Sequence, residues 1–207
     1  MSAPLLRPGL LEGVRIVVAV AGGASPADPG PDAFGGAAEV LCRELGARAA
    51  RIELDLREAG PPAEEHVCES VALALADVGG VDLALIDAAS MFAAAGGAGA
   101  EALALAMQLT WDLCRALAEQ SLVQEAAGVL VLLAPPPRAG VHADGARAGL
   151  ENLARTLSIE WARFGTRAVA VAPGDATTPA EAAELVAYLA SPAGAYFSGC
   201  LLDLRGG

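Results

Sequence analysis

Residues 14–21 read VRIVVAVA, a nearly unbroken apolar run in which β-branched side chains predominate. A run without polar alternation is typical of a strand that is buried on both faces of a parallel sheet. Further strands are predicted at residues 51–56, 81–88, 128–134, 167–172 and 200–204. Helices are predicted between them at residues 37–45, 63–78, 101–124, 144–164 and 179–190. This alternation predicts an α/β fold in which helices cover both faces of a parallel sheet, in a single domain over residues 1–207.

The composition fits a globular chain and excludes several function classes. Of the 207 residues, 55% are hydrophobic, and the formal net charge is -12. A chain this acidic repels nucleic-acid phosphates and anionic lipid headgroups, so we expect neither nucleic acid nor membrane as a partner. All 13 basic residues are arginine, which excludes any mechanism that needs a lysine ammonium group.

Metal sites and targeting segments are also not expected. The four cysteines form no CxxC pair, and His66 and His142 have no metal-site spacing relative to them. We interpret the cysteines as free thiols in a reducing compartment. The first residues lack a basic stretch followed by an apolar core, and no apolar run reaches the ~18 residues of a membrane span. We therefore expect a cytoplasmic protein.

The second half of the chain resembles the short-chain dehydrogenase/reductase family, whose members are Rossmann-type NAD(P)-dependent oxidoreductases. Residues 148–164, AGLENLARTLSIEWARF, resemble the helix that follows the family's catalytic Tyr-x-x-x-Lys. Residues 165–174, GTRAVAVAPG, resemble its G-I-R-V-N-x-V-x-P-G strand, and residues 179–207 resemble its closing helix and strand. Upstream, residues 86–89 read Ile-Asp-Ala-Ala where the family has Asn-Asn-Ala-Gly. The resemblance implies the family fold, a three-layer, doubly wound parallel sheet of Rossmann type, which is shortened in this chain and forms a single domain.

The resemblance also implies a defective catalytic site. The position of the catalytic lysine holds Arg147, and that of the tyrosine holds Ala143. The serine position falls at Ala134 and Pro135, neither of which has a hydroxyl group, and the asparagine position holds Gln108. Loss of a positioned proton donor typically slows a reaction by about 10²- to 10⁴-fold. Arginine is no substitute as a proton relay, because its guanidinium stays protonated.

Two residues near the lost tyrosine leave alternatives open. We favour Arg147 as a surface side chain near Glu151, which lies four residues further along the helix. His142 precedes the tyrosine position and titrates near neutrality, so it is an alternative acid.

The segment after the first strand is a poor cofactor site. Its glycines fit neither GxxxGxG nor GxGxxG; they are Gly22, Gly23, Gly30, Gly35 and Gly36. Its prolines lack amide donors, and its acids repel a dianionic ligand; they are Pro26, Pro29, Pro31, Asp28 and Asp32. We interpret Gly22, Gly23 and Asp55 as vestiges of the family's cofactor site, with Glu53 as a further candidate relic. We expect no bound cofactor.

The segment that covers the substrate in family members is short in this chain. Only residues 175–178 separate the Pro-Gly pair at 173–174 from the last helix. Without a lid, water would reach a reacting centre.

These observations predict a catalytically inactive protein of the short-chain dehydrogenase/reductase type. The favoured role is a non-catalytic subunit in a hetero-oligomer with an active family member, of a kind that often acts on acyl thioesters; self-association is the variant of this role. Trp111, Leu157 and Trp161 on the two long helices are the candidate interface residues. One alternative is a divergent NAD- or NADP-dependent enzyme that uses His142 or Arg147. Another is a free-standing module that binds a different small molecule.

Overall fold

The computed structural model describes residues 6–22, 33–56, 62–96 and 99–205. Its strands form one six-stranded sheet in the order β2-β1-β3-β4-β5-β6, and every pair of neighbours is parallel. The strands are β1 (Arg15–Gly22), β2 (Arg48–Asp55), β3 (Leu83–Asp87), β4 (Val129–Leu133), β5 (Arg167–Pro173) and β6 (Cys200–Leu204). The predicted α/β class and doubly wound parallel sheet are confirmed.

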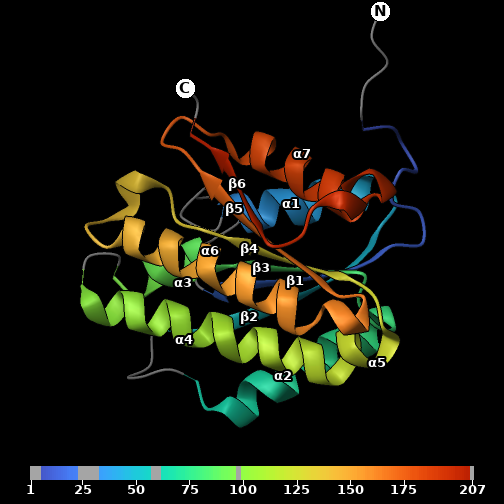
Figure 1. The fold of residues 1–207 in the computed structure, drawn as a ribbon, viewed down its shortest axis with the longest axis horizontal. Helices are drawn as coiled ribbons and strands as arrows, with labels where there is room; N and C mark the ends of the chain where they lie inside the picture. Colours follow the sequence, from blue (N-terminus) through green and yellow to red (C-terminus); the bar gives the residue numbers. More distant parts are fainter. Residues whose placement is uncertain (1–5, 23–32, 57–61, 97–98, 206–207) are drawn as a thin grey trace, which may run out of the picture.

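Helices cover both faces of this sheet (Figure 1). One face carries α1 (Ala33–Glu44) and α7 (Pro179–Ala190), which pack against each other. The other face carries α2 (Glu64–Val78), α3 (Ala88–Ala94), α4 (Ala100–Leu117) and α6 (Ala143–Glu160). Short helical turns complete the fold: Ala118–Leu122, α5 (Val123–Glu125), Pro137–Ala139, Ala162–Phe164 and Pro192–Tyr196.

The apolar runs of the sequence supply two cores, one on each side of the sheet. In β1, Val17 and Ala19 face the α2, α4 and α6 layer, whereas Val18 and Val20 face the α1 and α7 layer. All four side chains are 0% exposed. Burial on both faces explains why the strand has no polar alternation.

Three predicted elements differ in extent or number. Strand β2 begins at Arg48, and α1 at Ala33, in each case several residues earlier than predicted. The predicted helix at 101–124 divides into α4, a π turn at Ala118–Leu122 and α5. Helix α3 was not predicted, because its sequence AASMFAA is short and consists mainly of small residues without a polar face.

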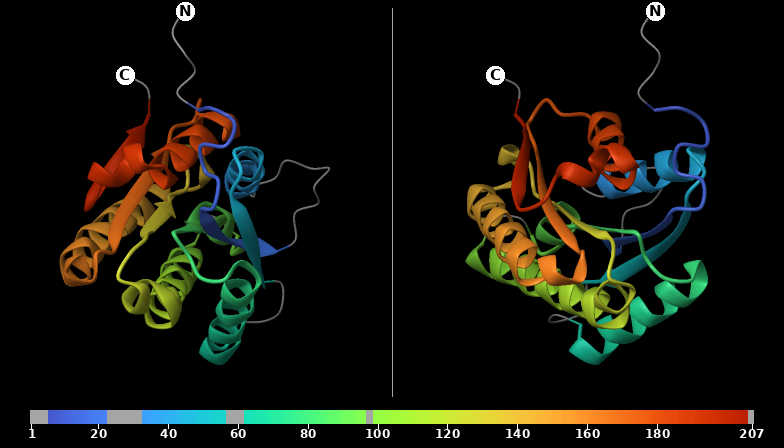
Figure 2. Two further views of the ribbon diagram at one scale, coloured as in Figure 1. Left: turned by 90° about the vertical axis from the view of Figure 1, so that its right-hand side faces the viewer. Right: turned by 45° about the vertical axis from the view of Figure 1, so that its right-hand side comes forward.

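The sheet is shortened at the β2 margin. In the doubly wound order 3-2-1-4-5-6, a third strand lies beyond the second. In the described part of this chain, β2 is the last strand at that margin (Figure 2, left).

The described residues contain neither a membrane-spanning helix nor a cluster of metal-binding side chains. None of the helices in that part of the chain is both long and apolar enough to cross a membrane. The same residues contain no group of three or more His, Cys, Asp or Glu side chains that could hold a metal ion.

Candidate active site

The carboxyl ends of the strands form the edge at which an open α/β sheet binds ligands. The order reverses between β1 and β3, and this topological switch point is where a dinucleotide would lie. A pyrophosphate bound there uses backbone N–H groups in the first turn of the helix after β1. The groups that surround this turn therefore decide whether such a ligand has room and partners.

A carboxylate of the chain itself lies at the switch point. Asp87, the last residue of β3, is 0% exposed. Its Oδ2 accepts a hydrogen bond from the Gly35 amide in the first turn of α1 (3.0 Å), and its Oδ1 accepts one from the Ser90 amide (3.0 Å). Asp87 thereby caps α3 and binds the first turn of α1 at the same time.

Ser90 extends this network to β1. Its Oγ donates to the Asp87 carbonyl (2.7 Å) and accepts the Ala21 amide (3.0 Å). Ser90 is 0% exposed, so these bonds are formed away from water. The ends of β1 and β3 are therefore held together by buried hydrogen bonds at the place where the family cofactor would approach.

Close packing fixes Gly35 at its position. A Cβ atom built on Gly35 would lie 2.7 Å from Asp87 Oδ2 and 2.9 Å from Val20 Cγ1. Neither neighbour is the end of a long flexible side chain, so any larger residue would displace the carboxylate or the strand. This glycine serves the contact with Asp87.

The predicted vestiges of the cofactor site are only partly described. Gly22 ends β1 and is half-buried, and Asp55 ends the neighbouring β2 and is exposed. Glu53 pairs with Arg51 at 3.3 Å, within the same strand. Gly23 lies outside the described residues. So do the other loop residues to which we assigned a negative effect on cofactor binding, namely Gly30, Pro26, Pro29, Pro31, Asp28 and Asp32.

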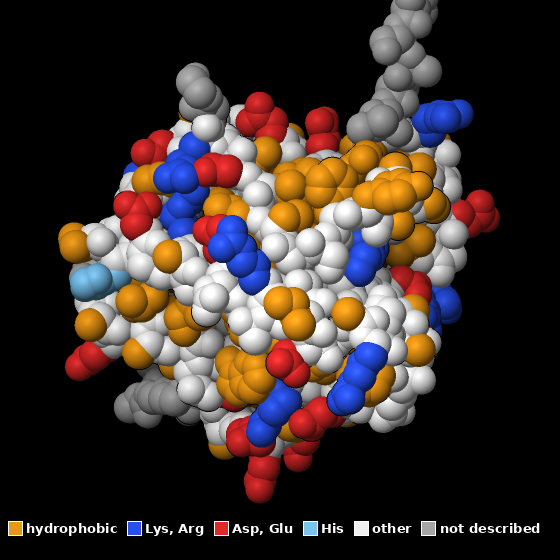
Figure 3. Space-filling view, in the orientation of Figure 1, with side chains coloured by type: hydrophobic (Ala, Val, Ile, Leu, Met, Phe, Trp, Pro, Cys, Tyr) orange, Lys and Arg blue, Asp and Glu red, His pale blue; other side chains and the backbone are white. Residues whose placement is uncertain are grey.

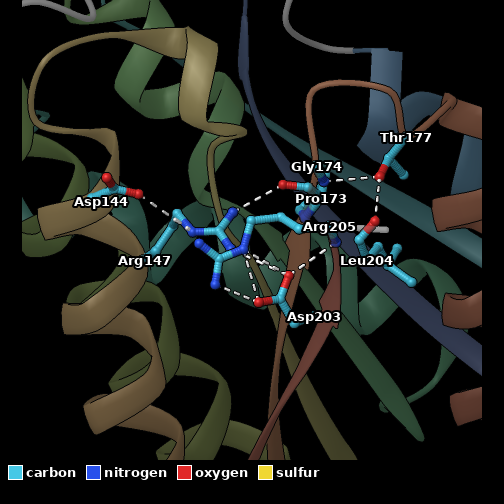
Figure 4. A network of polar contacts seen from close by, with 8 residues as sticks. All are labelled: Asp144, Arg147, Pro173, Gly174, Thr177, Asp203, Leu204 and Arg205. Carbon is cyan, nitrogen blue, oxygen red and sulfur yellow. Dashed lines mark hydrogen bonds and ion pairs between the residues drawn. The ribbon is translucent and has the colours of Figure 1, made fainter. Parts of the chain in front are cut away.

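Arg147 corrects a prediction. We expected a surface side chain near Glu151, but Arg147 is only 4% exposed and lies between α6 and the ends of β5 and β6 (Figure 4). Its Nη1 donates to the Pro173 carbonyl (2.9 Å) and its Nη2 to Asp203 Oδ1 (3.4 Å). The Glu151 carboxylate pairs with Arg155 instead. Spacing along the helix did not reveal this, because Arg147 lies on the face of α6 that turns toward the sheet.

Arg205 completes the charged cluster around Arg147. Its amide and its Nε each donate to Asp203 Oδ1 at 2.9 Å. These hydrogen bonds lower the pKa of Asp203 from 3.8 to about 2. Burial lowers the pKa of Arg147, and the nearby positive charge of Arg205 lowers it further. Two arginines thus share the Asp203 carboxylate, and Arg147 also lies 3.9 Å from Asp144 Oδ1 and donates to a backbone carbonyl.

The structure places the other residues that the resemblance aligned with catalytic positions, and His142, as follows. Ala143, the first residue of α6, is 1% exposed. Pro135 is buried just after β4. Gln108 is exposed and donates to Asp112 of its own helix (3.0 Å). His142 is half-buried and precedes α6 without a side-chain hydrogen bond to the helix end.

The short segment after β5 is tied to the protein on both sides. The Asp175 carboxylate accepts the Arg138 amide (2.8 Å). Thr177 Oγ1 accepts the Gly174 amide (2.8 Å) and donates to the Leu204 carbonyl (3.1 Å) (Figure 4). These bonds fix the segment beside the ends of β5 and β6.

The three candidate interface residues differ in exposure. Trp111 of α4 is 41% exposed. Trp161 follows α6, is half-buried and packs against the core. Leu157 is 3% exposed and belongs to the core, so its assignment to an interface is corrected. Its spacing with Leu150 marks the sheet-facing stripe of α6 rather than a surface.

Asp87 is the site residue that sequence reasoning overlooked as a functional group. The signal was present in the sequence Asp-Ala-Ala-Ser after an apolar strand, because Asp is a favoured N-cap residue. Its second bond, to Gly35, joins residues 52 positions apart and has no local signal.

Comparisons with known proteins agree with this fold. No protein-family model matches the chain. Solved structures do: a short chain dehydrogenase from Mycobacterium smegmatis, with 20% identity and a TM-score of 0.73, matches over 99% of this chain and 98% of its own. A hydroxysteroid dehydrogenase from Escherichia coli has 16% identity and a TM-score of 0.71, over 96% and 98% of the two chains. A citronellol catabolism dehydrogenase from Pseudomonas aeruginosa has 21% identity and a TM-score of 0.69, over 97% of each chain. The chain therefore has the fold of the short-chain dehydrogenases.

Proposed function

We propose that this protein is a catalytically inactive relative of the short-chain dehydrogenases, and that it binds neither NAD nor NADP. The observation that carries the proposal is the buried carboxylate of Asp87, which takes the Gly35 amide in the first turn of α1. In a dinucleotide site, the amides of that turn meet the pyrophosphate. Here a pyrophosphate would have to approach a carboxylate with the same sign of charge, in surroundings of low dielectric where repulsion is strong.

The catalytic end of the site supports the same conclusion. Ala143 and Pro135 carry no hydroxyl group, so they have no proton to transfer to or from a carbonyl substrate. Arg147 remains protonated and is bound to the Pro173 carbonyl and Asp203. It fills space and balances charge, and a divergent enzyme that used it as an acid would first have to break this cluster.

The proposed role is association with an active dehydrogenase of this fold, in which this chain is the non-catalytic subunit. The surface that supports it runs along α4 beside α6, where apolar side chains lie between charged ones (Figure 3). Leu103, Met107 and Trp111 are spaced four residues apart on α4, and all are partly or well exposed. Large aromatic side chains of this kind are enriched at the centres of protein interfaces. We propose acyl thioesters as the substrate class of the complex. The alternative within this role is that the chain associates with a second copy of itself.

Calorimetric titration tests the cofactor part of the proposal. NADH and NADPH are added separately to the isolated chain, and an active short-chain dehydrogenase titrated in the same buffer serves as the positive control. We expect no binding tighter than about 1 mM, or about -4 kcal/mol. A dissociation constant in the micromolar range would contradict the proposal.

Purification under mild conditions tests the partner. We expect the tagged chain, isolated from its native source, to bring with it a chain that contains an intact Tyr-x-x-x-Lys. Trp111→Ala should reduce this recovery, because truncation of an interface hot spot costs about 2 kcal/mol or more. Tyr196→Ala is the matched control, since Tyr196 is 93% exposed on the turn after α7. Equal recovery with Trp111→Ala and wild type, or loss only with Tyr196→Ala, would reject the α4 surface.

A further inference from the structure

Strand β2 lies at one edge of the sheet, and no described strand lies beyond it. An edge strand presents unpaired backbone groups, which are a template for another strand. We propose that a second copy of this chain docks here, with the two β2 strands antiparallel across a two-fold axis. This inference is independent of the proposed function, because it neither uses the α4 surface nor requires that a cofactor be absent; Glu53, a candidate relic of the cofactor site, enters it only through its charge.

The backbone of β2 shows which residues would form the new ladder. The Arg48 amide donates to the Val14 carbonyl (2.9 Å), so residue 48 turns its backbone groups toward the β1 side. The β1–β2 register runs without interruption from Arg48 to Asp55, and backbone groups alternate sides along a strand. The residues that turn their backbone groups outward are therefore Ala49, Arg51, Glu53 and Asp55. The Ala49 carbonyl already accepts a hydrogen bond from Arg43, which leaves residues 51 and 53 as the centre of a new ladder.

The charges on these residues select one register and one partner. The outward-turned part of β2 is basic at Arg51 and acidic at Glu53 and Asp55, so it complements itself when reversed. With the two-fold axis at Ile52, each Arg51 lies opposite Glu53 of the second copy. A shift of the axis to residue 51 places two arginines opposite each other, and a shift to residue 53 places two glutamates there. Opposite charges across a ladder stabilise it and like charges destabilise it, so of these three registers the one at Ile52 is favourable.

The side chain of Arg51 is already held in place for this contact. Its Nε donates to Glu39 of α1 at 2.7 Å, and its Nη1 lies 3.3 Å from Glu53. Glu39 is only 12% exposed in its side chain, whereas that of Glu53 is 60% exposed. Glu39 thus anchors the arginine, and Glu53 remains accessible to an arginine of a second copy.

A hollow beside β2, lined by apolar and by charged residues such as Arg51 and Glu53, offers the two copies a further contact. It has a volume of about 290 Å³, lies between β2 and α2, and is lined by Ile52, Ser70, Ala74 and Asp77, among others. At its rim, Leu73 of α2 is 74% exposed. Antiparallel pairing of the β2 strands brings the two α2 helices toward each other across the axis. Leu73 of each copy is then able to cover the hollow of the other.

Sedimentation velocity on single and mixed charge variants tests the proposal. We expect wild type at about 50 µM to be mainly dimeric. Glu53→Arg places arginine opposite arginine, and Arg51→Glu places glutamate opposite glutamate, so each should weaken the dimer by about tenfold or more. An equimolar mixture of the two variants restores complementary pairs at both positions, and we expect a heterodimer. A monomeric wild type, an unchanged Glu53→Arg dimer, or a mixture that stays monomeric would each overturn the proposal.

A second pair of variants keeps the test valid if Arg51→Glu disturbs its contact with Glu39. Leu73→Asp should also weaken the dimer by about tenfold, whereas Val141→Asp should not. Val141 is 85% exposed, at the start of the segment that leads into α6. Circular dichroism on all variants confirms that the monomer remains folded. A dimer that is weakened equally by both aspartates, or by neither, would overturn the assignment to the β2 margin.

Discussion

Asp87 and Asp203 are two carboxylates near the carboxyl ends of strands in the same sheet, yet the chain holds them in opposite ways. Asp87 ends β3, is 0% exposed and accepts backbone amides from the first turns of α1 and α3. Asp203 is near the end of β6, its side chain is 34% exposed, and its partners include the side chains of Arg147 and Arg205. The described partners of Asp87 are thus backbone amides, whereas Asp203 is bound mainly by two arginine side chains.

This difference indicates how strongly the structure holds each carboxylate. Buried backbone donors lose much when their acceptor is removed, because water cannot replace it. Exposed ion pairs lose little, because water and salt screen them. The Asp87 end of the site is thus held by backbone hydrogen bonds of the fold itself, whereas the Asp203 end holds a charged cluster that substitution can change.

The largest effect is expected from Asp87→Ala. The substitution leaves the buried Gly35 and Ser90 amides without this acceptor, and each unsatisfied donor costs about 1–3 kcal/mol. We expect the free energy of unfolding, measured by urea titration, to fall by about 2–5 kcal/mol. Asp144→Ala is the control, because the Asp144 side chain is 81% exposed. A loss below about 1 kcal/mol for Asp87→Ala would show that the two amides find other partners, and the comparison would fail.

An intermediate effect is expected from Arg147→Met. Methionine keeps much of the side-chain length but leaves the Pro173 carbonyl without the Nη1 donor. The loss is partly offset because a desolvated guanidinium is removed. We expect unfolding to become easier by about 1–2 kcal/mol. Arg155→Met, on the same helix but 61% exposed, should change stability by less than about 0.5 kcal/mol. Equal losses of stability at the two positions would show that Arg147 contributes no more to stability than an exposed arginine does.

The sequence predicted the layers of this fold better than the contacts of its site. Apolar runs indicate burial, so the strands and the helices α2 and α7 were predicted to within a few residues. The burial of Arg147 was missed, because a polar residue at helical spacing from Glu151 gives the same pattern on an inner or an outer face. The Asp87–Gly35 bond joins two chain segments that only the sheet topology brings together. Ala143 and Pro135, in contrast, became candidate site positions only through the resemblance.

A small, pH-dependent effect is expected from Asp203→Asn. Because the folded-state pKa of Asp203 is lowered to about 2, its stabilisation is present above the ordinary value of 3.8 and is lost as the pH falls through 2. At pH 7 we expect the free energy of unfolding of wild type to exceed that of the variant by less than about 1 kcal/mol, because the Asp203 side chain is 34% exposed and screened by water. Urea titrations at pH 7 and at about pH 2 should show that the difference disappears in acid. If the difference in stability persisted in acid, it would come from packing rather than from the charge of Asp203.

The smallest expected effect, none, concerns catalysis by the double variant Ala143→Tyr/Arg147→Lys. It restores the family's tyrosine and lysine at their positions, yet Pro135 still offers no hydroxyl and Asp87 still takes the Gly35 amide. Catalytic groups that act as a unit do not recover activity one at a time. We therefore expect no oxidation of NADH or NADPH above wild type with a 3-oxoacyl thioester, the substrate class proposed for the complex. Ala143 is 1% exposed, so the tyrosine must displace neighbours, and circular dichroism with Arg147→Lys alone as a folded companion controls for this. Cofactor-dependent turnover in either variant would show that the cofactor side is open, and that the contrast between Asp87 and Asp203 does not describe how this site is closed.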